Sequence, residues 1–186
     1  MSRWTEYRAR WDGCQECDLC ETRTKVVLLR GAIPCDVLFL GEAPGTSEDV
    51  LGKPFVGPAG KLLDRIIDDA KADLETIREE PRIAWTNLIS CIPKGPDGDN
   101  LQEPANAHIK ACSERLRGLV EILKPQAIIT VGKLAHKWGP QILNGFQGRW
   151  AAVIHPVVIL RADISQQGLA IQKCQVIISD IFEGLE

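Results

Sequence analysis

Short apolar runs alternate along this chain with segments whose apolar residues recur at helical spacing. Runs typical of buried strands lie at residues 35–41, 83–89, 126–131 and 150–154. Helical spacing is found at residues 59–70 and 105–123 and in a last stripe at 177–185, and residues 132–138 are expected to open a short helix. Such alternation is typical of a parallel sheet covered by helices. We therefore predict a single α/β domain over residues 1–186, with a mainly parallel four-stranded sheet flanked by helices.

Composition and charge exclude several classes of protein. Hydrophobic residues make up 45% of the 186 residues and charged residues 25%, which are ordinary values for a globular domain. The apolar runs are too short to span a membrane, and the polar N-terminus lacks the apolar core of a secretion signal. We therefore expect a cytoplasmic protein, active as a monomer and without a membrane partner.

Charge is distributed unevenly, although the net charge is only −3. Residues 122–162 contain five Lys and Arg side chains and no Asp or Glu. This stretch predicts either a local basic face for a polyanion or a solvated surface that happens to lack acids.

The cysteines indicate a metal centre. There are seven, and an odd number in a chain without a secretion signal argues against a disulfide framework. Cys14, Cys17 and Cys20 are spaced by two residues each within a polar segment. Both iron–sulfur clusters and zinc are bound by thiolates at this spacing.

Chemically capable residues follow the predicted strands at their carboxyl ends. Ligands of open parallel sheets bind beyond those ends. The residues in question are Gly41 and Glu42 after the first strand, Asn87 in the second, Gly132 after the third and His155 after the fourth. We therefore predict one binding crevice at this edge of the sheet.

The block GEAPGTSEDVLGKPFVGPAGKLLD at residues 41–64 resembles the signature of the iron–sulfur uracil-DNA glycosylases, family 4 of their superfamily. The cysteine segment at 14–23, the middle motifs around Asn87 and Cys112, and the later motifs up to Arg161 match the same family. Two departures stand out. Residues 92–104 replace an Arg-Pro-Pro and Asn-Arg segment, and Val157 replaces the serine of a His-Pro-Ser motif.

The resemblance implies a DNA repair enzyme that flips uracil out of DNA and hydrolyses its N-glycosidic bond, leaving an abasic site without cutting the strand. His155 would donate a hydrogen bond to the uracil O2, Glu48 would orient water, and Glu42 would shape the pocket. Either acid is alternatively a loop residue that binds backbone N–H groups. His155, likewise, is alternatively a loop histidine packed beside Pro156.

The same resemblance assigns the remaining site residues. Phe55 would stack on the base, Asn87 would read its edge, and Ala43 and Gly45 would offer backbone groups. The structural alternatives are a core anchor for Phe55 and a buried asparagine that satisfies backbone groups. On the DNA side, Ile159 and Leu160 would wedge into the base stack, and Arg161 would attract phosphates. Independently of the resemblance, the positive charge of Arg149 is a further candidate for phosphate attraction.

A [4Fe–4S] cluster is the cofactor that the resemblance implies, held by Cys14, Cys17, Cys91 and Cys112. Tetrahedral zinc on the same four thiolates is the alternative. The remaining cysteines, Cys20, Cys35 and Cys174, are not expected to be ligands.

Two other functions stay open because of the departures. The chain would then be an iron–sulfur DNA-binding module with weak or no activity, or a glycosylase for deaminated purines.

Overall fold

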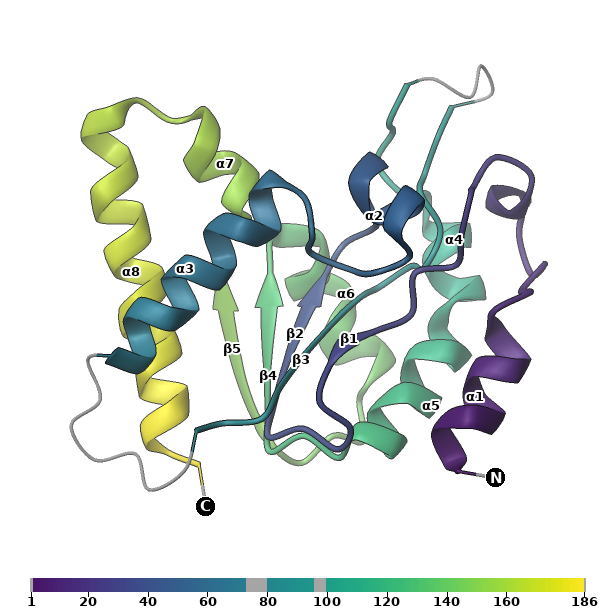
Figure 1. The fold of residues 1–186 in the computed structure, drawn as a ribbon, viewed down its shortest axis with the longest axis horizontal. Helices are drawn as coiled ribbons and strands as arrows, with labels where there is room; N and C mark the ends of the chain where they lie inside the picture. Colours follow the sequence, from purple (N-terminus) through teal and green to yellow (C-terminus); the bar gives the residue numbers. More distant parts are fainter. Residues whose placement is uncertain (1, 73–79, 96–99, 186) are drawn as a thin grey trace.

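The computed structural model describes residues 2–72, 80–95 and 100–185. Five strands form one sheet in the order β1-β3-β2-β4-β5. The strands are β1 (Arg30–Gly31), β2 (Val37–Gly41), β3 (Ile83–Asn87), β4 (Ala127–Val131) and β5 (Arg149–Val153). Strands β3, β2, β4 and β5 run parallel, so their carboxyl ends meet at the upper edge of the sheet in Figure 1.

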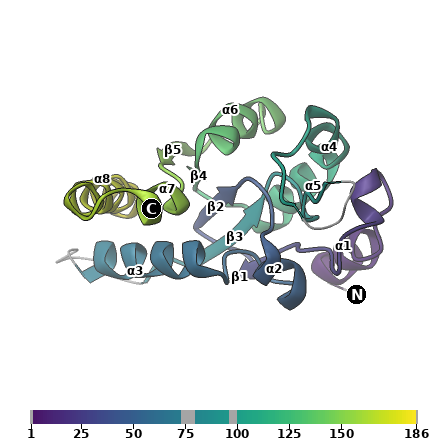
Figure 2. The same cartoon turned by 90° about the horizontal axis from the view of Figure 1, so that it is seen from above.

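Helices cover both faces of the sheet, which Figure 2 shows from above. One face carries α3 (Pro58–Ala72), α7 (Pro156–Arg161) and α8 (Ile164–Glu183). The other carries α1 (Arg3–Trp11), α4 (Asn106–Ala111), α5 (Ser113–Leu123) and α6 (Lys133–Ile142). A short helix, α2 (Thr46–Leu51), and a 3-10 turn, η1 (Asp18–Cys20), lie in the connecting loops.

The alternation of side chains along β2 explains why there are two cores. Val37 and Phe39 pack with the α3 and α8 residues, whereas Leu38 and Leu40 pack with those of α1, α5 and α6. All four are completely buried. A strand buried on both faces is uniformly apolar, which is why this run could be recognised in the sequence.

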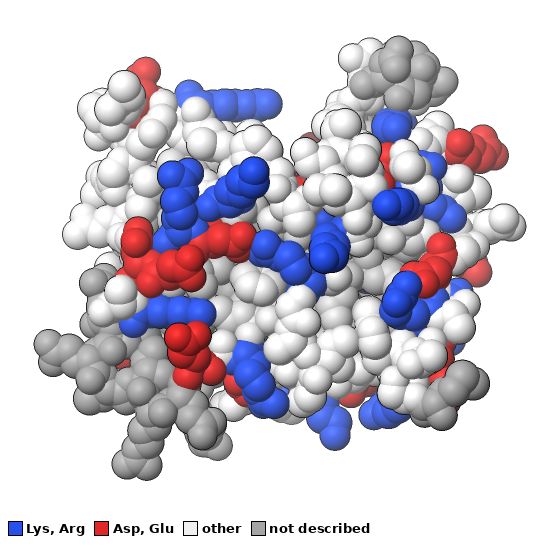
Figure 3. All heavy atoms as spheres, viewed as in Figure 1, with Lys and Arg blue, Asp and Glu red and all other residues white. Residues whose placement is uncertain are grey.

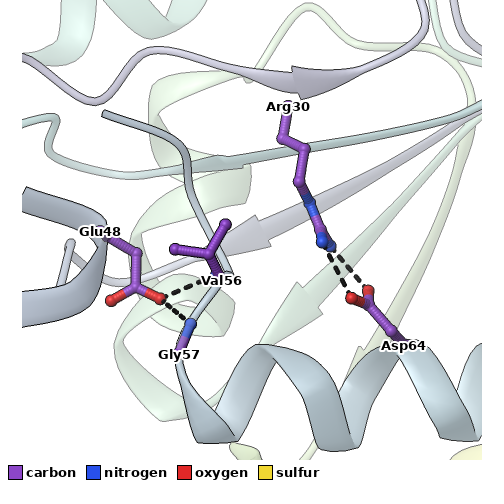
Figure 4. A network of polar contacts seen from close by, with 5 residues as sticks. All are labelled: Arg30, Glu48, Val56, Gly57 and Asp64. Carbon is purple, nitrogen blue, oxygen red and sulfur yellow. Dashed lines mark hydrogen bonds and ion pairs between the residues drawn. The ribbon is translucent and has the colours of Figure 1, made fainter. Parts of the chain in front are cut away.

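The prediction of four strands is wrong by one edge strand. Strand β1 has only two residues, too few for any apolar pattern, and it pairs antiparallel with β3. Side-chain contacts hold it instead. Arg30 donates two hydrogen bonds of 2.6 and 2.8 Å to the Asp64 carboxylate on α3 (Figure 4). Its guanidinium also lies 4.0 Å from the Trp85 ring centre.

Two helix predictions also need correction. Residues 105–123 form two helices, because the backbone turns at Cys112 between α4 and α5. The last helix begins at Ile164 rather than 177, since its first turns leave large apolar residues in solvent and so break the burial pattern.

The segment that departs from the family pattern forms an antiparallel pair beside the sheet edge. Gln102 N donates to Pro93 O at 2.8 Å, and Gly95 N donates to Asn100 O at 2.7 Å. The ends of this segment are thus paired, and its residues 96–99 lie outside the described residues. Within the described ranges, no helix is both long enough and apolar enough to cross a membrane.

Candidate active site

A cleft of about 620 Å³ opens at the carboxyl ends of the parallel strands. Its lining includes the predicted residues Glu42, Ala43, Gly45, Glu48, Phe55, Asn87, His155 and Leu160. The space-filling view shows a hollow at this upper edge of the molecule, and opposite charges interspersed on the face that carries α3 (Figure 3). The sheet therefore brings together in one cleft most of the residues proposed for the site.

The floor of the cleft is built around Gly41, the last residue of β2. A Cβ atom there would lie 2.3 Å from Asn87 Oδ1 and 2.5 Å from Phe55 Cζ. Any larger residue at position 41 would therefore push both side chains out of place. Phe55 itself has a φ of 56°, an uncommon conformation for a non-glycine residue, and its ring is almost completely buried.

Asn87 presents an unused carboxamide to this floor. It ends β3 and is 3% exposed. Its main-chain oxygen accepts a 2.6 Å hydrogen bond from Arg115 Nη2, but its side chain makes no hydrogen bond within the described residues. The carboxamide therefore has both a donor and an acceptor available for a ligand.

His155 lies opposite, directly after β5, and caps the N-terminus of α7. Its Nδ1 accepts a hydrogen bond from Val157 N at 3.2 Å. Burial lowers the pKa of the imidazole and so favours the neutral ring. With Nδ1 as an acceptor, the single ring proton of neutral His155 is assigned to Nε2, which then acts as a donor.

Gly132 allows His155 to come this close to the end of β4. The glycine has a φ of +91°, and a Cβ there would lie 3.1 Å from the Cβ of His155. A side chain at position 132 would be strained by the backbone conformation and crowded by the imidazole at the same time.

Glu48 is held by the backbone of its own loops. Its Oε1 accepts from Val56 N at 2.9 Å and from Gly57 N at 2.7 Å (Figure 4). Its Oε2 accepts from Gly45 N at 3.1 Å. The carboxylate thus ties the start of α2 to the loop before α3. This is the structural alternative considered for Glu48, and it leaves little of the carboxylate for water.

Glu42 is the acid in the cleft whose carboxylate is not used by the protein. It follows β2 and makes no side-chain hydrogen bond within the described part of the chain. Burial, followed by the charge of Glu103, raises the pKa of this carboxyl group. A half-buried carboxylate with free oxygens is suited to hold a water molecule.

The three residues predicted to contact DNA all lie on α7, but they differ in their exposure to solvent. Leu160 is 45% exposed and lines the cleft, and Arg161 is exposed at the end of the helix. The expectation for Ile159 is wrong, because only 1% of this residue is exposed and it packs in the core with α3 and α8. Helical periodicity places Val158 outward instead, 59% exposed and in the cleft wall.

Arg149 needs a similar correction. It begins β5, at the end of the sheet opposite the cleft, and its Nη2 donates to Asp180 on α8 at 2.9 Å. The acid-free stretch at 122–162 is therefore not one continuous face for a polyanion. Sequence reasoning also missed Pro93, Leu101 and Gln102, which line the cleft from the segment that departs from the family pattern.

The four cysteines proposed as ligands all lie in or against the core cluster on the face of the sheet that carries α1 and α5. Cys91 and Cys112 are buried, and Cys14 and Cys17 pack against the same cluster. Arg23 bridges two of them, with Nη2 donating to Cys14 O at 2.5 Å and Nη1 to Cys91 Sγ at 3.5 Å. Cys35 and Cys174 are buried core residues, as expected.

Their environment fits a cationic metal centre in chemistry, though not in the exact placement of the side chains. Burial and the charges of Cys112 and Cys17 raise the pKa of Cys91 to about 12, despite the opposing charge of Arg23. Thiols gathered in an apolar site become thiolates when a metal binds them. As placed, however, no three His, Cys, Asp or Glu side chains of the described ranges are close enough together to hold an ion.

Comparison with known proteins identifies relatives of the chain. The sequence profile of the uracil DNA glycosylase superfamily matches residues 30–174. The type-4 uracil-DNA glycosylase of Saccharolobus solfataricus is 42% identical over 120 residues, covering 64% of this chain and 51% of that protein. That of Pyrobaculum aerophilum is 34% identical over 167 residues, covering 80% of each chain.

Solved structures show the same fold at low sequence identity. Pedobacter heparinus SMUG2 has a TM-score of 0.60 at 14% identity, covering 81% of this chain and 77% of its own. A putative uracil DNA glycosylase from Methanosarcina acetivorans has a TM-score of 0.52 at 14% identity, covering 82% of this chain and 98% of its own.

The chain therefore belongs to the uracil-DNA glycosylase superfamily. Within it, the relatives of highest identity given above are type-4 enzymes, and the chain is a member of that family. It spans about half the length of the Saccharolobus solfataricus relative (51%).

Proposed function

We propose that the protein is a monofunctional uracil-DNA glycosylase, which hydrolyses the bond between uracil N1 and the deoxyribose C1′. The observation that carries the proposal is the convergence of Phe55, Asn87 and His155 in one cleft at the strand ends. Each presents the chemistry that a flipped uracil needs: an aromatic surface, an unpaired carboxamide and an imidazole donor.

Recognition of the base would rest on Phe55 and Asn87. The ring of Phe55 stacks on the flipped base, and the carboxamide of Asn87 pairs with uracil O4 and N3–H. Backbone groups of Ala43 and Gly45 line the same wall and complete the contact. Cytosine presents a donor where uracil presents O4, so a carboxamide held in one orientation discriminates between them.

Bond cleavage would rest on His155. As the C1′–N1 bond breaks, its electron pair moves into the uracil ring and negative charge grows on O2. The Nε2–H of neutral His155 donates to that oxygen, an interaction that strengthens as the charge develops. The sugar meanwhile acquires positive charge at C1′.

Glu42 is our candidate for holding the water that attacks C1′. Its carboxylate has free oxygens, stabilises the sugar cation and accepts a proton from the water as the new C–O bond forms. Glu48 is instead a positioning residue, since backbone N–H groups occupy both its oxygens. Phe55, between these loops, is held in place by that arrangement.

DNA would be held at the mouth of the cleft by α7, with Leu160 and Val158 against the base stack and Arg161 near a phosphate. Cys14, Cys17, Cys91 and Cys112 would hold a [4Fe–4S] cluster, whose role is to fix the N-terminal segment to the core. No lysine has a place in this mechanism as a nucleophile, so strand cleavage is not expected.

A base-release assay tests the proposal. Oligonucleotides containing uracil, hypoxanthine or xanthine are incubated with the protein, and alkali then cuts at abasic sites. Cutting of the uracil strand alone, and only after alkali, is expected. Cutting of a purine substrate in its place would favour a deaminated-purine glycosylase, and DNA binding without base release would favour a binding module, as the departures at Val157 and 92–104 allow.

A further inference from the structure

A buried arginine lies behind the base-reading end of β3. Arg115 on α5 is 1% exposed. Its Nη2 donates to Asn87 O at 2.6 Å and to Leu88 O at 3.1 Å, and its Nη1 lies 3.4 Å from Thr86 Oγ1. One guanidinium thus contacts three consecutive residues at the point where the strand leaves the sheet.

The setting of Arg115 is unusual for a buried cation. No carboxylate of the described residues forms an ion pair with it, and its nearest ionisable groups are Tyr7 and Cys112. Tyr7 donates to the main-chain oxygen of Arg115 at 2.9 Å. Buried charges without a carboxylate partner are rare in proteins, so a role beyond simple filling of the core is indicated.

The main-chain contacts explain what the guanidinium does. The carbonyls of Asn87 and Leu88 lie at the end of the β2–β3 ladder, and Arg115 supplies donors to both. On the other side, Leu88 N donates to Gly41 O at 2.9 Å. The backbone that carries Asn87 is therefore fixed from both sides, next to Gly41, whose lack of a Cβ leaves the space that the Asn87 side chain occupies.

We propose that Arg115 is a positioning residue for base recognition, which fixes the main chain at Asn87 and so aims its carboxamide at the base. The inference rests on the proposed function. It follows that loss of the guanidinium weakens recognition of the flipped uracil, while the DNA contacts at α7, on the other side of the cleft, stay intact.

Two DNA ligands separate these effects. One duplex carries 2′-fluorodeoxyuridine, whose glycosidic bond resists hydrolysis, and the other carries a tetrahydrofuran abasic site with no base to read. For Arg115→Met we expect about tenfold weaker affinity for the first duplex, the ratio that corresponds to losing a hydrogen bond or two. Affinity for the tetrahydrofuran duplex should stay unchanged.

Arg117→Met is the matched control, because Arg117 is exposed on the same helix and contacts none of the β3 residues. Both affinities should equal those of the wild type. Arg115→Lys keeps a cation that can reach one carbonyl, so an intermediate loss is expected. An equal loss for both duplexes in the Arg115 variants would overturn the positioning role.

A double-mutant cycle with Asn87→Ala tests whether Arg115 acts through Asn87. The double variant should bind the fluorouridine duplex no more weakly than Asn87→Ala alone. Additive losses would overturn the inference, as would the absence of a cooperative thermal transition in both Arg115 variants, which would show a general folding role. If the wild-type protein does not bind the fluorouridine duplex more tightly than the tetrahydrofuran duplex, the proposed function is overturned, and this inference with it.

Discussion

At the scale of single residues, the polar side chains of the cleft are of two kinds. Some form hydrogen bonds with the protein backbone, and others have no hydrogen-bond partner among the described residues. Glu48 and His155 Nδ1 accept hydrogen bonds from backbone amides. The carboxamide of Asn87 and the carboxylate of Glu42 accept none from the described residues. Both groups line the cleft, so they are available to a ligand that enters it.

His155→Ala should lower the rate of uracil release far more than it lowers affinity for DNA. Removal of one donor to a developing oxyanion typically costs on the order of 10²–10³ in rate. Single-turnover rates and equilibrium binding to a tetrahydrofuran duplex measure the two quantities. A variant that releases uracil at the wild-type rate would place the donor elsewhere.

Glu42→Gln and Glu48→Gln should have different effects, the first on the rate of uracil release and the second on stability. The first should slow uracil release at an unchanged melting temperature, since no backbone group depends on the Glu42 side chain. The second should lower stability by about 1–3 kcal/mol, because an amide cannot accept from all three backbone donors. Thermal unfolding and single-turnover rates compare them, and an unchanged melting temperature for Glu48→Gln would contradict the assignment.

The pH dependence of the rate of uracil release should also reflect the titration of Glu42. Because the pKa of this carboxyl group is raised, its carboxylate form is lost at a higher pH than that of an ordinary carboxyl group as the pH falls. The acid limb of the wild-type rate should therefore include this group, and it should become shallower in Glu42→Gln.

Sequence reasoning placed both acids at the site and assigned the water to Glu48, whereas we propose that Glu42 holds it, because Glu48 accepts from three backbone amides. The roles depend on how the loops at 45 and 56–57 fold around Glu48, and no spacing in the sequence reveals backbone amides that converge on one carboxylate. The error at Ile159 has a simpler cause. The resemblance supplied a stretch of residues, whereas the rotation of α7 decides which of them reach solvent.

At the scale of elements, α7 carries most of the expected contact with DNA. Val157 is half-buried in the cleft wall, and its backbone N–H is already donated to His155. That amide is therefore not available for a phosphate, and the valine side chain offers no donor in its place. A serine hydroxyl at this position would supply one.

Val157→Ser should therefore tighten binding to uracil-containing DNA or raise the rate of base release. A hydrogen bond to a charged phosphate is worth roughly 1.5–3 kcal/mol, about tenfold or more in affinity. Val176→Ser, an exposed change on α8, is the matched control and should have no effect. Unchanged or poorer values for Val157→Ser would mean that the valine is an adapted packing residue.

Arg161 and Arg149 provide a matched pair of basic residues. Arg161→Ala should weaken DNA affinity several-fold and reduce its salt dependence, because a phosphate contact is lost. Arg149→Ala should leave DNA affinity unchanged, since its guanidinium pairs with Asp180 at the far end of the sheet. Equal losses in the two variants would mean that only net charge matters.

Elements with a strong pattern were predictable, and those held by side chains or turns were not. All four apolar runs are strands, because a strand buried on both faces is apolar throughout. Strand β1, in contrast, depends on Arg30, Asp64 and Trp85, which are far apart in the sequence. The break at Cys112 was equally hidden, since the residues on either side continue the helical spacing.

At the scale of the whole molecule, the region around the four cysteines joins segments that are distant in the sequence. Arg23 links the residues around Cys14 to Cys91, and His108 on α4 lies 2.9 Å from Asp18 beside Cys17. Lys94 Nζ lies 3.6 Å from the buried Asp49 carboxylate and so ties this region to α2. A group bound to the four thiols would hold the same segments together and support the cleft from behind.

Protein purified without oxygen should therefore be brown and contain iron and sulfide. Alanine at Cys14, Cys17, Cys91 or Cys112 should remove the colour and lower the melting temperature, because each loss leaves an incomplete ligand set and frees one of the joined segments. Cys20→Ala is the matched control from the same polar segment and should keep both. Iron content, the visible spectrum and thermal unfolding measure the outcome. Stoichiometric zinc without iron would show that the four thiolates hold the other metal, and bleaching by Cys20→Ala would show that the ligand set is assigned wrongly.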